Sequence, residues 1–202
     1  DLHSRDRRQR QMCIRDRYKV VTTKELIDKN TLSPFEIKCL VLQYSEDITH
    51  FLKGMKYQEE ITFLVQNEKR NNFIRNLALK LNTNTLILFQ LVEKHGKILY
   101  DLIEEKANGR KVFFVFGGTD TEDRERIRGI VEKEKDAIIV ASYGTFSTGI
   151  NITNLHNVIF ASPSKSRVRN LQSIGRGLRK NETKEIATLY DIADDLSYKS
   201  YK

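Results

Sequence analysis

From residue 67 onward, short apolar runs alternate with amphipathic stretches. The runs are apolar at almost every position, which is typical of strands in a parallel sheet that helices cover on both sides. In the stretches between them, apolar residues recur at helical spacing. This order of strand and helix predicts an α/β fold, an open parallel sheet with right-handed crossovers and helices on both faces. The predicted strands are residues 86–89, 112–116, 137–140, 158–161 and 186–190.

The amphipathic stretches predict helices that contain residues 73–81, 98–103, 119–131 and a stretch after residue 163. Thr119 is expected to begin its helix, with Glu122 three residues later as the partner in a capping box. In an open parallel sheet, ligands bind outside the carboxyl ends of the strands. Functional residues are therefore expected directly after each strand.

Residues 18–66 are predicted to form an interdomain connector with a strand and a helix. Residues 35–42 alternate and then become continuously apolar, which favours a strand, and Cys39 is expected to be a small core residue within it. Residues 57–65 favour a helix. The remaining residues, 67–202, are enough for one substantial domain.

The first 17 residues differ in composition from the rest, because they hold six Arg and no Lys. The string from Met12 to Arg17 resembles translated sequencing adapter. We expect residues 1–17 to be a non-native or disordered basic leader; the alternative is a natural basic arm that binds nucleic acid. Without these residues, the net charge of +8 falls to +5. A basic chain favours a polyanionic partner, of which nucleic acid is the first candidate.

Other features exclude several classes of site. Cys13 and Cys39 lack further ligands at metal-binding spacing, so no metal site and no disulfide is expected, and a cytoplasmic location fits best. No apolar run is long enough for a membrane helix. His95 and His156 have no nucleophile or carboxylate beside them in the sequence and are expected at the surface. The pair Asp194–Asp195 is expected to begin a helix or to be solvated.

Residues 168–180 carry the most informative pattern. On a helix, Arg169, Gln172, Arg176 and Arg179 form an outward row, opposite an apolar stripe that can pack on the sheet. Gly175 lies within this stretch, and glycine lowers helix propensity, which suggests that another group approaches closely. A row of guanidinium groups suits the recognition of phosphate. The alternative is a solvated basic face.

Two further segments follow predicted strands. After residues 137–140 comes a hydroxyl-rich loop with Ser142 and Thr145, and such groups suit contacts to a phosphate backbone. The alternative is an ordinary turn between a strand and a helix. Residues 117–119, which are Gly117, Gly118 and Thr119, connect a strand to a helix, where free amides can hold a phosphate. A plain tight turn is equally consistent with the two glycines.

The order and spacing of these segments resemble the motifs in the second RecA-like domain of superfamily-two helicases. The resemblance covers about residues 20–200 of this chain. By that resemblance, Arg176 and Arg179 are catalytic arginine fingers for ATP bound on a partner domain. Ser142 and Thr145 then contact the nucleic-acid backbone. The nucleotide-facing residues would be Gly149, Asn151, Gln172 and Gly175. Many members of the superfamily have Asp where Asn151 stands, and this difference removes a charge from the site.

The phosphate loop of such enzymes is missing, because no Gly-x-x-x-x-Gly-Lys-Ser/Thr string occurs in the chain. The expected fold is therefore RecA-like, a P-loop NTPase fold without the P-loop. ATP and Mg²⁺ would be held mainly by a first RecA-like domain that precedes residue 1, so this part alone is expected to be inactive.

Within the superfamily, the likeness is to T-even phage recombination helicases. It implies a DNA or RNA–DNA helicase that acts in recombination and branch migration on branched or single-stranded DNA or RNA–DNA hybrids. Two alternatives stay open. One is the double-strand DNA translocase subunit of a restriction-modification system, and the other is a non-catalytic nucleic-acid-binding module.

Overall fold

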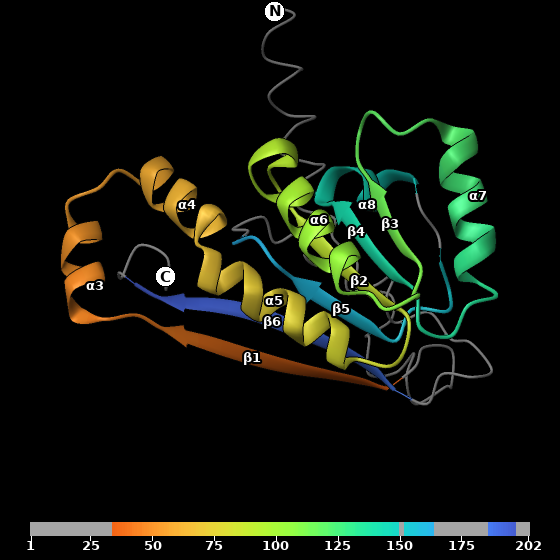
Figure 1. Ribbon diagram of the computed structural model, residues 1–202, viewed down its shortest axis with the longest axis horizontal. Coiled ribbons are helices and arrows are strands. Elements are labelled where there is room, and N and C mark those ends of the chain that lie inside the picture. Colours follow the sequence, from red (N-terminus) through yellow and green to blue (C-terminus); the bar gives the residue numbers. More distant parts are fainter. Residues whose placement is uncertain (1–33, 150–151, 164–185, 197–202) are drawn as a thin grey trace, which may run out of the picture. The chain divides into compact units, whose positions relative to one another are not determined.

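Within the residues that the structure describes, six strands form one parallel sheet. The computed structural model describes residues 34–149, 152–163 and 186–196 (Figure 1). The strands are β1 (Phe35–Gln43), β2 (Thr85–Phe89), β3 (Val112–Val115), β4 (Ile138–Ser142), β5 (Asn157–Phe160) and β6 (Ala187–Asp195). The helices are α3 (Glu46–Lys53), α4 (Tyr57–Gln66), α5 (Glu68–Lys80), the π-helix η1 (Val92–Gly96), α6 (Lys97–Glu105), α7 (Thr121–Val131) and α8 (Tyr143–Gly149).

The order of strands in the sheet is β1-β6-β5-β2-β4-β3, and every neighbouring pair is parallel. All six strands therefore end at the same side of the sheet, which we call the carboxyl edge. The chain crosses the sheet in one direction from β1 to β3 and returns through β4 and β5 to β6. In open α/β sheets, ligands bind outside the carboxyl ends of the strands, where the direction of the connections reverses.

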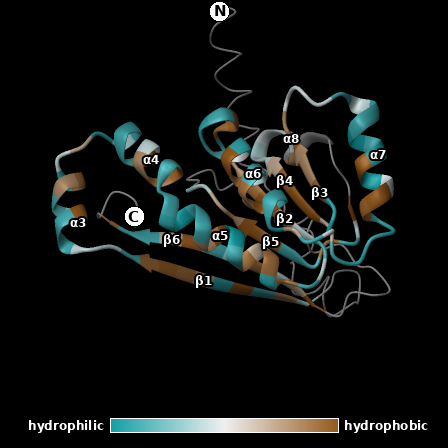
Figure 2. Ribbon diagram, viewed as in Figure 1, coloured by the Kyte–Doolittle hydropathy of each residue, from teal (hydrophilic) through white to brown (hydrophobic). Residues whose placement is uncertain are grey.

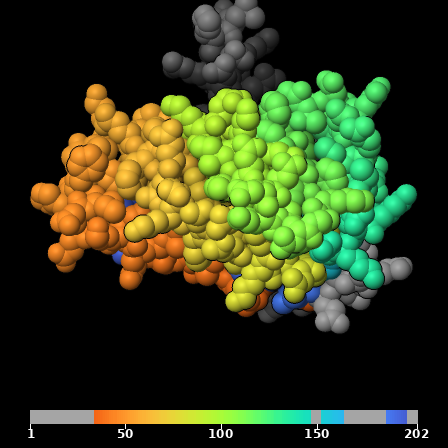
Figure 3. Space-filling model, viewed as in Figure 1, coloured from red at the N-terminus to blue at the C-terminus, as the bar shows by residue number. Residues whose placement is uncertain are grey.

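Helices α5 and α6 cover one face of the sheet, and Figure 3 shows them as a continuous surface over it. Ile74 and Ala78 of α5, together with Leu99 and Ile103 of α6, are fully buried against the strands. Burial of each large side chain of this kind stabilises the fold by about 1.5–3 kcal/mol. Figure 2 shows the result as hydrophobic strands behind helices whose outer faces are hydrophilic.

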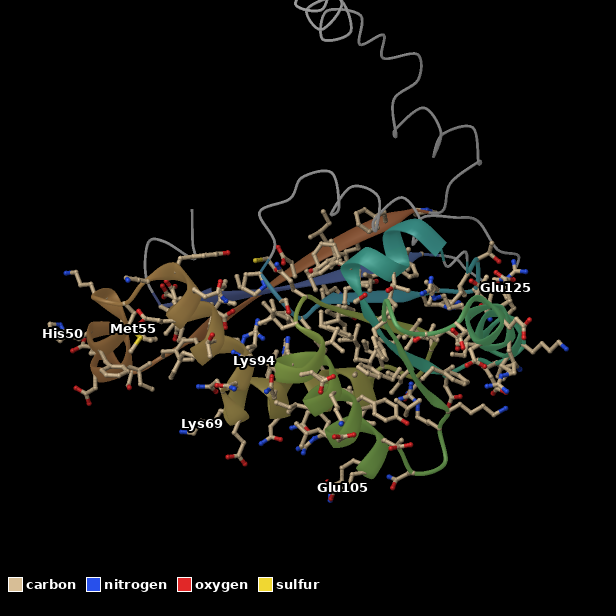
Figure 4. The ribbon with its side chains drawn as sticks, turned by 90° about the horizontal axis from the view of Figure 1, so that it is seen from above. His50, Met55, Lys69, Lys94, Glu105 and Glu125 are labelled. Carbon is tan, nitrogen blue, oxygen red and sulfur yellow. The ribbon has the colours of Figure 1, made fainter. Side chains whose placement is uncertain are left out.

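Helices α7 and α8 cover the opposite face. Ile127 and Val131 of α7 and Phe146 of α8 belong to a second buried cluster on this face. Figure 4 shows α8 on one side of the sheet, with α5 and α6 on the other. Strands with a helical layer on both sides are hydrophobic on both faces, and this is why the apolar runs are continuous.

A third, smaller cluster lies where β1 and β6 end. Leu52 of α3, Leu64 of α4 and Leu196, which follows β6, are buried together. This cluster holds α3 and α4 against the carboxyl ends of the two strands. None of the described helices has the length and apolar character that crossing a membrane requires.

The predicted open parallel sheet with helices on both faces is confirmed. The five strands predicted after residue 67 agree with β2 to β6 within two residues at each boundary, apart from the end of β6. The strand and the helix predicted within residues 18–66 correspond to β1 and α4. β1 pairs with β6 along nine residues of this sheet, from Phe35 to Gln43.

Two local predictions were wrong. Cys39 is exposed rather than part of the core, because Leu40 and Leu42 turn the other face of β1 toward the cluster under α5 and α6. Helix α7 begins at Thr121 instead of Thr119, and its N-cap residue Asp120 makes no side-chain cap hydrogen bond. The expected capping box is therefore absent.

Candidate functional site

Ser142 and Thr145 meet at the carboxyl edge, directly after β4. Ser142 is the last residue of β4 and lies opposite Phe89, the last residue of β2. Its Oγ is 2.8 Å from Oγ1 of Thr145, and the backbone N–H of Thr145 donates to the same Oγ at 3.3 Å. The segment expected to be a loop is helix α8. Ser142 satisfies an amide of its first turn, as serine does at helix starts.

The two hydroxyls differ in accessibility. Thr145 is buried, with 5% of its surface exposed, whereas Ser142 is half-buried. A ligand at the carboxyl edge can therefore reach Ser142 directly, while Thr145 orients the Ser142 hydroxyl. Gly149 ends α8. Asn151 lies outside the described residues.

Gly117, Gly118 and Thr119 form a tight turn at the end of β3. The N–H of Thr119 donates to the carbonyl oxygen of Phe116 at 3.0 Å, and the N–H of Phe116 donates to Oγ1 of Thr119 at 3.1 Å. Both glycines are exposed. A Cβ on Gly118 would lie 2.7 Å from a ring carbon of Phe116, whereas a Cβ on Gly117 would meet nothing within 4 Å. Close approach to the Phe116 ring thus explains glycine at one of the two positions.

The turn also has a charged neighbour. Nη2 of Arg124, on α7, donates to the carbonyl oxygen of Gly117 at 3.2 Å. This contact holds the exposed turn against the first turns of α7. The amides of Gly117 and Gly118 lie on the exposed part of that turn, at the same edge of the sheet as Ser142.

A buried ion pair, which the sequence analysis missed, lies behind the carboxyl edge. Nε of Arg70, on α5, donates to Oδ1 of Asp194 at 2.8 Å, and Nη2 donates to Oδ2 at 3.0 Å. The expectation that Asp194 begins a helix or is solvated was wrong, because it lies in β6 with 4% of its surface exposed. The hydroxyl of Tyr44 donates to Oδ1 of Asp194 at 2.8 Å. Burial, followed by the charge of Asp194, raises the pKa of Tyr44.

His95 is fully buried, so its predicted surface position was also wrong. It lies in η1, and its Nδ1 is 2.9 Å from Oγ of Ser162. Burial, and secondly the charge of Arg70, lowers its pKa to about 3. The imidazole is therefore neutral at neutral pH, and its Nε2 has no hydrogen-bond partner among the described residues.

Four of the predicted site residues come from one stretch of the chain. Arg176, Arg179, Gln172 and Gly175 lie outside the described residues. The structure thus brings together Ser142 and Thr145 and places the turn at residues 117–119 on the same edge. In the described part of the chain, no group of three or more His, Cys, Asp or Glu residues is arranged to hold a metal ion.

The chain is similar to known helicases both in sequence and in structure. The family model described as "Helicase conserved C-terminal domain" matches residues 68–181. The ATP-dependent DNA helicase UvsW of Enterobacteria phage T4 is 42% identical over 185 residues, which are 90% of this chain and 36% of the relative. The chain therefore spans about a third of the length of that relative.

Solved structures agree with this match. The crystal structure of T4 UvsW superimposes with a TM-score of 0.70 at 42% identity, over 85% of this chain and 36% of that one. The E. coli DEAD-box protein SrmB gives a TM-score of 0.51 at 17% identity, over 63% of this chain and 71% of that one. The restriction-modification enzyme LlaBIII, solved bound to DNA, gives 0.55 at 18%, over 82% of this chain and 12% of that one. The last two show the fold alone, and the predicted RecA-like class is confirmed.

Proposed function

Because the chain belongs to the helicase conserved C-terminal domain family, we propose that it is the second motor domain of an ATP-dependent DNA or RNA–DNA helicase. In this proposal the longer protein acts in recombination and branch migration, the role implied by the resemblance that the sequence motifs carry. Its substrates are branched or single-stranded DNA or RNA–DNA hybrids. A first RecA-like domain, in the same polypeptide, supplies the other half of the motor.

The observation that carries the proposal is the position of Ser142 at the carboxyl edge. The Ser142 hydroxyl is half-exposed and is oriented by Thr145, and the amides of Gly117 and Gly118 lie on the same edge. Hydroxyls and exposed amides bind phosphate oxygens without reading bases. A row of such groups suits a protein that moves along a strand, because its contacts must repeat at every nucleotide whatever the sequence.

The nucleotide would be bound mainly by the other domain. This chain contains no phosphate loop, and its described residues form no acidic metal site. ATP and Mg²⁺ are therefore assigned to the first domain. Gly149, Asn151, Gln172 and Gly175 would face the nucleotide from this side. Arg176 and Arg179 would stabilise the charge that develops on the γ-phosphate during transfer.

Closure on ATP would bring the two domains together, and opening after hydrolysis would separate them. Both domains hold the same nucleic-acid strand. Each cycle of closure and opening therefore moves the contact made by one domain along that strand relative to the contact made by the other, and this movement is translocation. In this arrangement the chain before β1 leads from the first domain, whereas β1, α3 and α4 belong to the domain described here, because β1 pairs with β6.

Binding of a fluorescent forked DNA to this chain, measured by anisotropy, tests the proposal. Ser142→Ala should weaken binding about tenfold or more, because one hydrogen bond to a charged phosphate is lost. The matched control is Ser45→Ala at the start of α3, where Ser45 makes no side-chain cap hydrogen bond. Equal affinity of wild-type and Ser142→Ala chains would contradict the assigned contact.

A strand-displacement assay with the longer protein separates the helicase from its rivals. A helicase releases one strand of the fork when ATP is present. A double-strand translocase of a restriction-modification system would hydrolyse ATP without releasing a strand, and a non-catalytic binding module would do neither.

A further inference from the structure

Strand β1 is an edge of the sheet, because it pairs with β6 on one side and no described strand lies on its other side (Figure 1). The N–H of Ala187, at the start of β6, donates to the carbonyl oxygen of Pro34 at 2.9 Å. Backbone groups of successive residues in a strand point alternately to its two sides. The N–H and C=O groups of the odd-numbered residues from Phe35 to Gln43 therefore point away from β6, where they can accept a further strand.

The side chains of β1 do little to protect this edge. The strand is nine residues long, and its apolar residues Ile37 and Val41 are 59% and 44% exposed, with the exposed Cys39 between them. Proteins usually shorten an edge strand or charge it, because a long apolar edge pairs with other chains. The charged residues of β1 are Glu36 and Lys38, which have opposite signs. The strand thus has the length and the apolar character of one that pairs.

The two charges of β1 are complementary to those of a second copy of the same strand. Nζ of Lys38 is 3.2 Å from Oε2 of Glu36, and the two side chains are 45% and 48% exposed. Both lie on one face of the strand, on either side of Ile37. If a second β1 pairs antiparallel about Ile37, each Glu36 lies opposite the partner's Lys38, and no other register brings these charges opposite each other. Opposite charges directly across a strand pair stabilise it, whereas like charges destabilise it.

We propose that β1 is a self-association surface, on which a second copy of this chain pairs antiparallel with Ile37 at the two-fold axis. Ile37 then lies opposite the partner's Ile37, and Phe35 lies opposite the partner's Cys39, so that outward backbone groups of the two strands meet. A contact of this kind uses the same surface on both copies and closes as a dimer. Because the axis is perpendicular to the sheet, the two carboxyl edges face in opposite directions. The inference goes beyond the proposed function and does not depend on it.

Sedimentation velocity of this chain tests the proposal. Contacts of small area are weak, so the measurement compares about 10 µM with about 500 µM protein, and the wild type should shift from monomer toward dimer. Glu36→Lys should raise the dissociation constant about tenfold or more, because two pairs of like charges then face each other. The double variant Glu36→Lys, Lys38→Glu exchanges the two charges and should restore the dissociation constant to within about threefold of the wild type. This restoration also shows that the change at residue 36 leaves the chain folded.

A matched variant separates strand pairing from net charge. Glu105→Lys makes the same change of charge on α6, where the Glu105 side chain is 64% exposed (Figure 4). It should keep the wild-type dissociation constant, because α6 lies away from β1.

Disulfide cross-linking of single-cysteine chains tests the register, in a background with Cys13→Ser and Cys39→Ser. Ile37→Cys should form a covalent dimer under mild oxidation. The Cα atoms of a hydrogen-bonded antiparallel pair are about 5.5 Å apart, which a disulfide can bridge. Val41→Cys is the matched control at another exposed position of β1. In the proposed register its two copies lie about 26 Å apart along the strands, so it should not cross-link.

A wild-type chain that stays monomeric at both concentrations overturns the inference. A dimer that Glu36→Lys weakens no more than Glu105→Lys also overturns it, because the contact then lies on another surface. The proposed register is overturned if the double variant associates as weakly as Glu36→Lys, or if Val41→Cys cross-links as readily as Ile37→Cys. None of these results bears on the binding of forked DNA, so the proposed function stands or falls separately.

Discussion

Arg70 and Asp194 form a two-point ion pair in the interior, 124 residues apart in the sequence. Their side chains are 0% and 1% exposed. Asp194 also accepts from the hydroxyl of Tyr44, and Nη1 of Arg70 donates to the carbonyl oxygen of Ala161 at 2.7 Å. The pair therefore joins α5 to the carboxyl ends of β5 and β6, directly behind the candidate site.

Replacing Arg70 by alanine should be among the most destabilising single changes in the chain. The change leaves the Asp194 carboxylate buried and without its cation, which costs about 3–5 kcal/mol. Urea denaturation followed by circular dichroism measures the effect. The control is Arg75→Ala on the same helix, because the Arg75 guanidinium donates to Oδ1 of the exposed Asn76, and its effect should stay within about 0.5 kcal/mol. Similar midpoints for the two variants would contradict the importance of the pair.

This pair shows why the sequence could not predict the interior behind the site. Asp194 and Asp195 resemble a solvated pair, and Arg70 lies in a helix with many charged residues. Nothing local marks either residue as buried, because the partner of each comes from a distant element. The sheet itself was predictable, since continuous apolar runs such as 86–89 and 137–140 have few other uses in a chain with this alternation.

Gly96 permits η1 to pack directly against β2. A Cβ at Gly96 would lie 2.4 Å from ring carbons of Phe89, which is fully buried and cannot move aside easily. Gly96→Ala should therefore destabilise the fold by about 1–3 kcal/mol. Gly129→Ala on α7 is the control, because its Cβ meets nothing within 4 Å. That change should stabilise the helix by about 0.5–1 kcal/mol, and thermal melting of both variants checks the opposite signs.

The buried His95 should make the stability fall in mild acid. Its pKa is about 3 in the folded chain and 6.5 for an unburied histidine. Below pH 6.5 the unfolded chain binds a proton at this histidine that the folded chain does not bind. The stability that the neutral, buried His95 contributes is therefore fully present above pH 6.5 and is lost as the pH falls toward 3. The loss approaches about 1.4 kcal/mol per pH unit.

The measurement is the free energy of unfolding at about pH 7 and about pH 5, for wild type and for His95→Asn. The variant lacks the titrating ring. Its free energy of unfolding should therefore fall between about pH 7 and about pH 5 by about 1–2 kcal/mol less than that of the wild type. His50→Gln, at an exposed histidine, serves as the control and should keep the wild-type dependence. Equal pH dependence in wild type and His95→Asn would rule out the buried neutral imidazole.

Positions such as His95 and Cys39 depend on details that periodicity does not encode. His95 turns inward because a π-helical turn, η1, follows β2 in place of a regular helix start. Cys39 turns outward because one face of the edge strand β1 packs beneath α5 while Cys39 lies on the other. By contrast, the position of Ser142 and Thr145 at the carboxyl edge follows from the sequence, because Ser142 ends β4 and Thr145 comes three residues later, in the first turn of α8.

The steady-state ATPase of the longer protein on forked DNA tests the central claim most directly. The claim is that this chain completes a nucleotide site whose other wall is a separate domain. With Arg179→Ala, turnover should fall by about a thousandfold or more, the range seen for arginine fingers, while the Kd for forked DNA stays within twofold. Turnover equal to that of the wild-type protein would contradict the account.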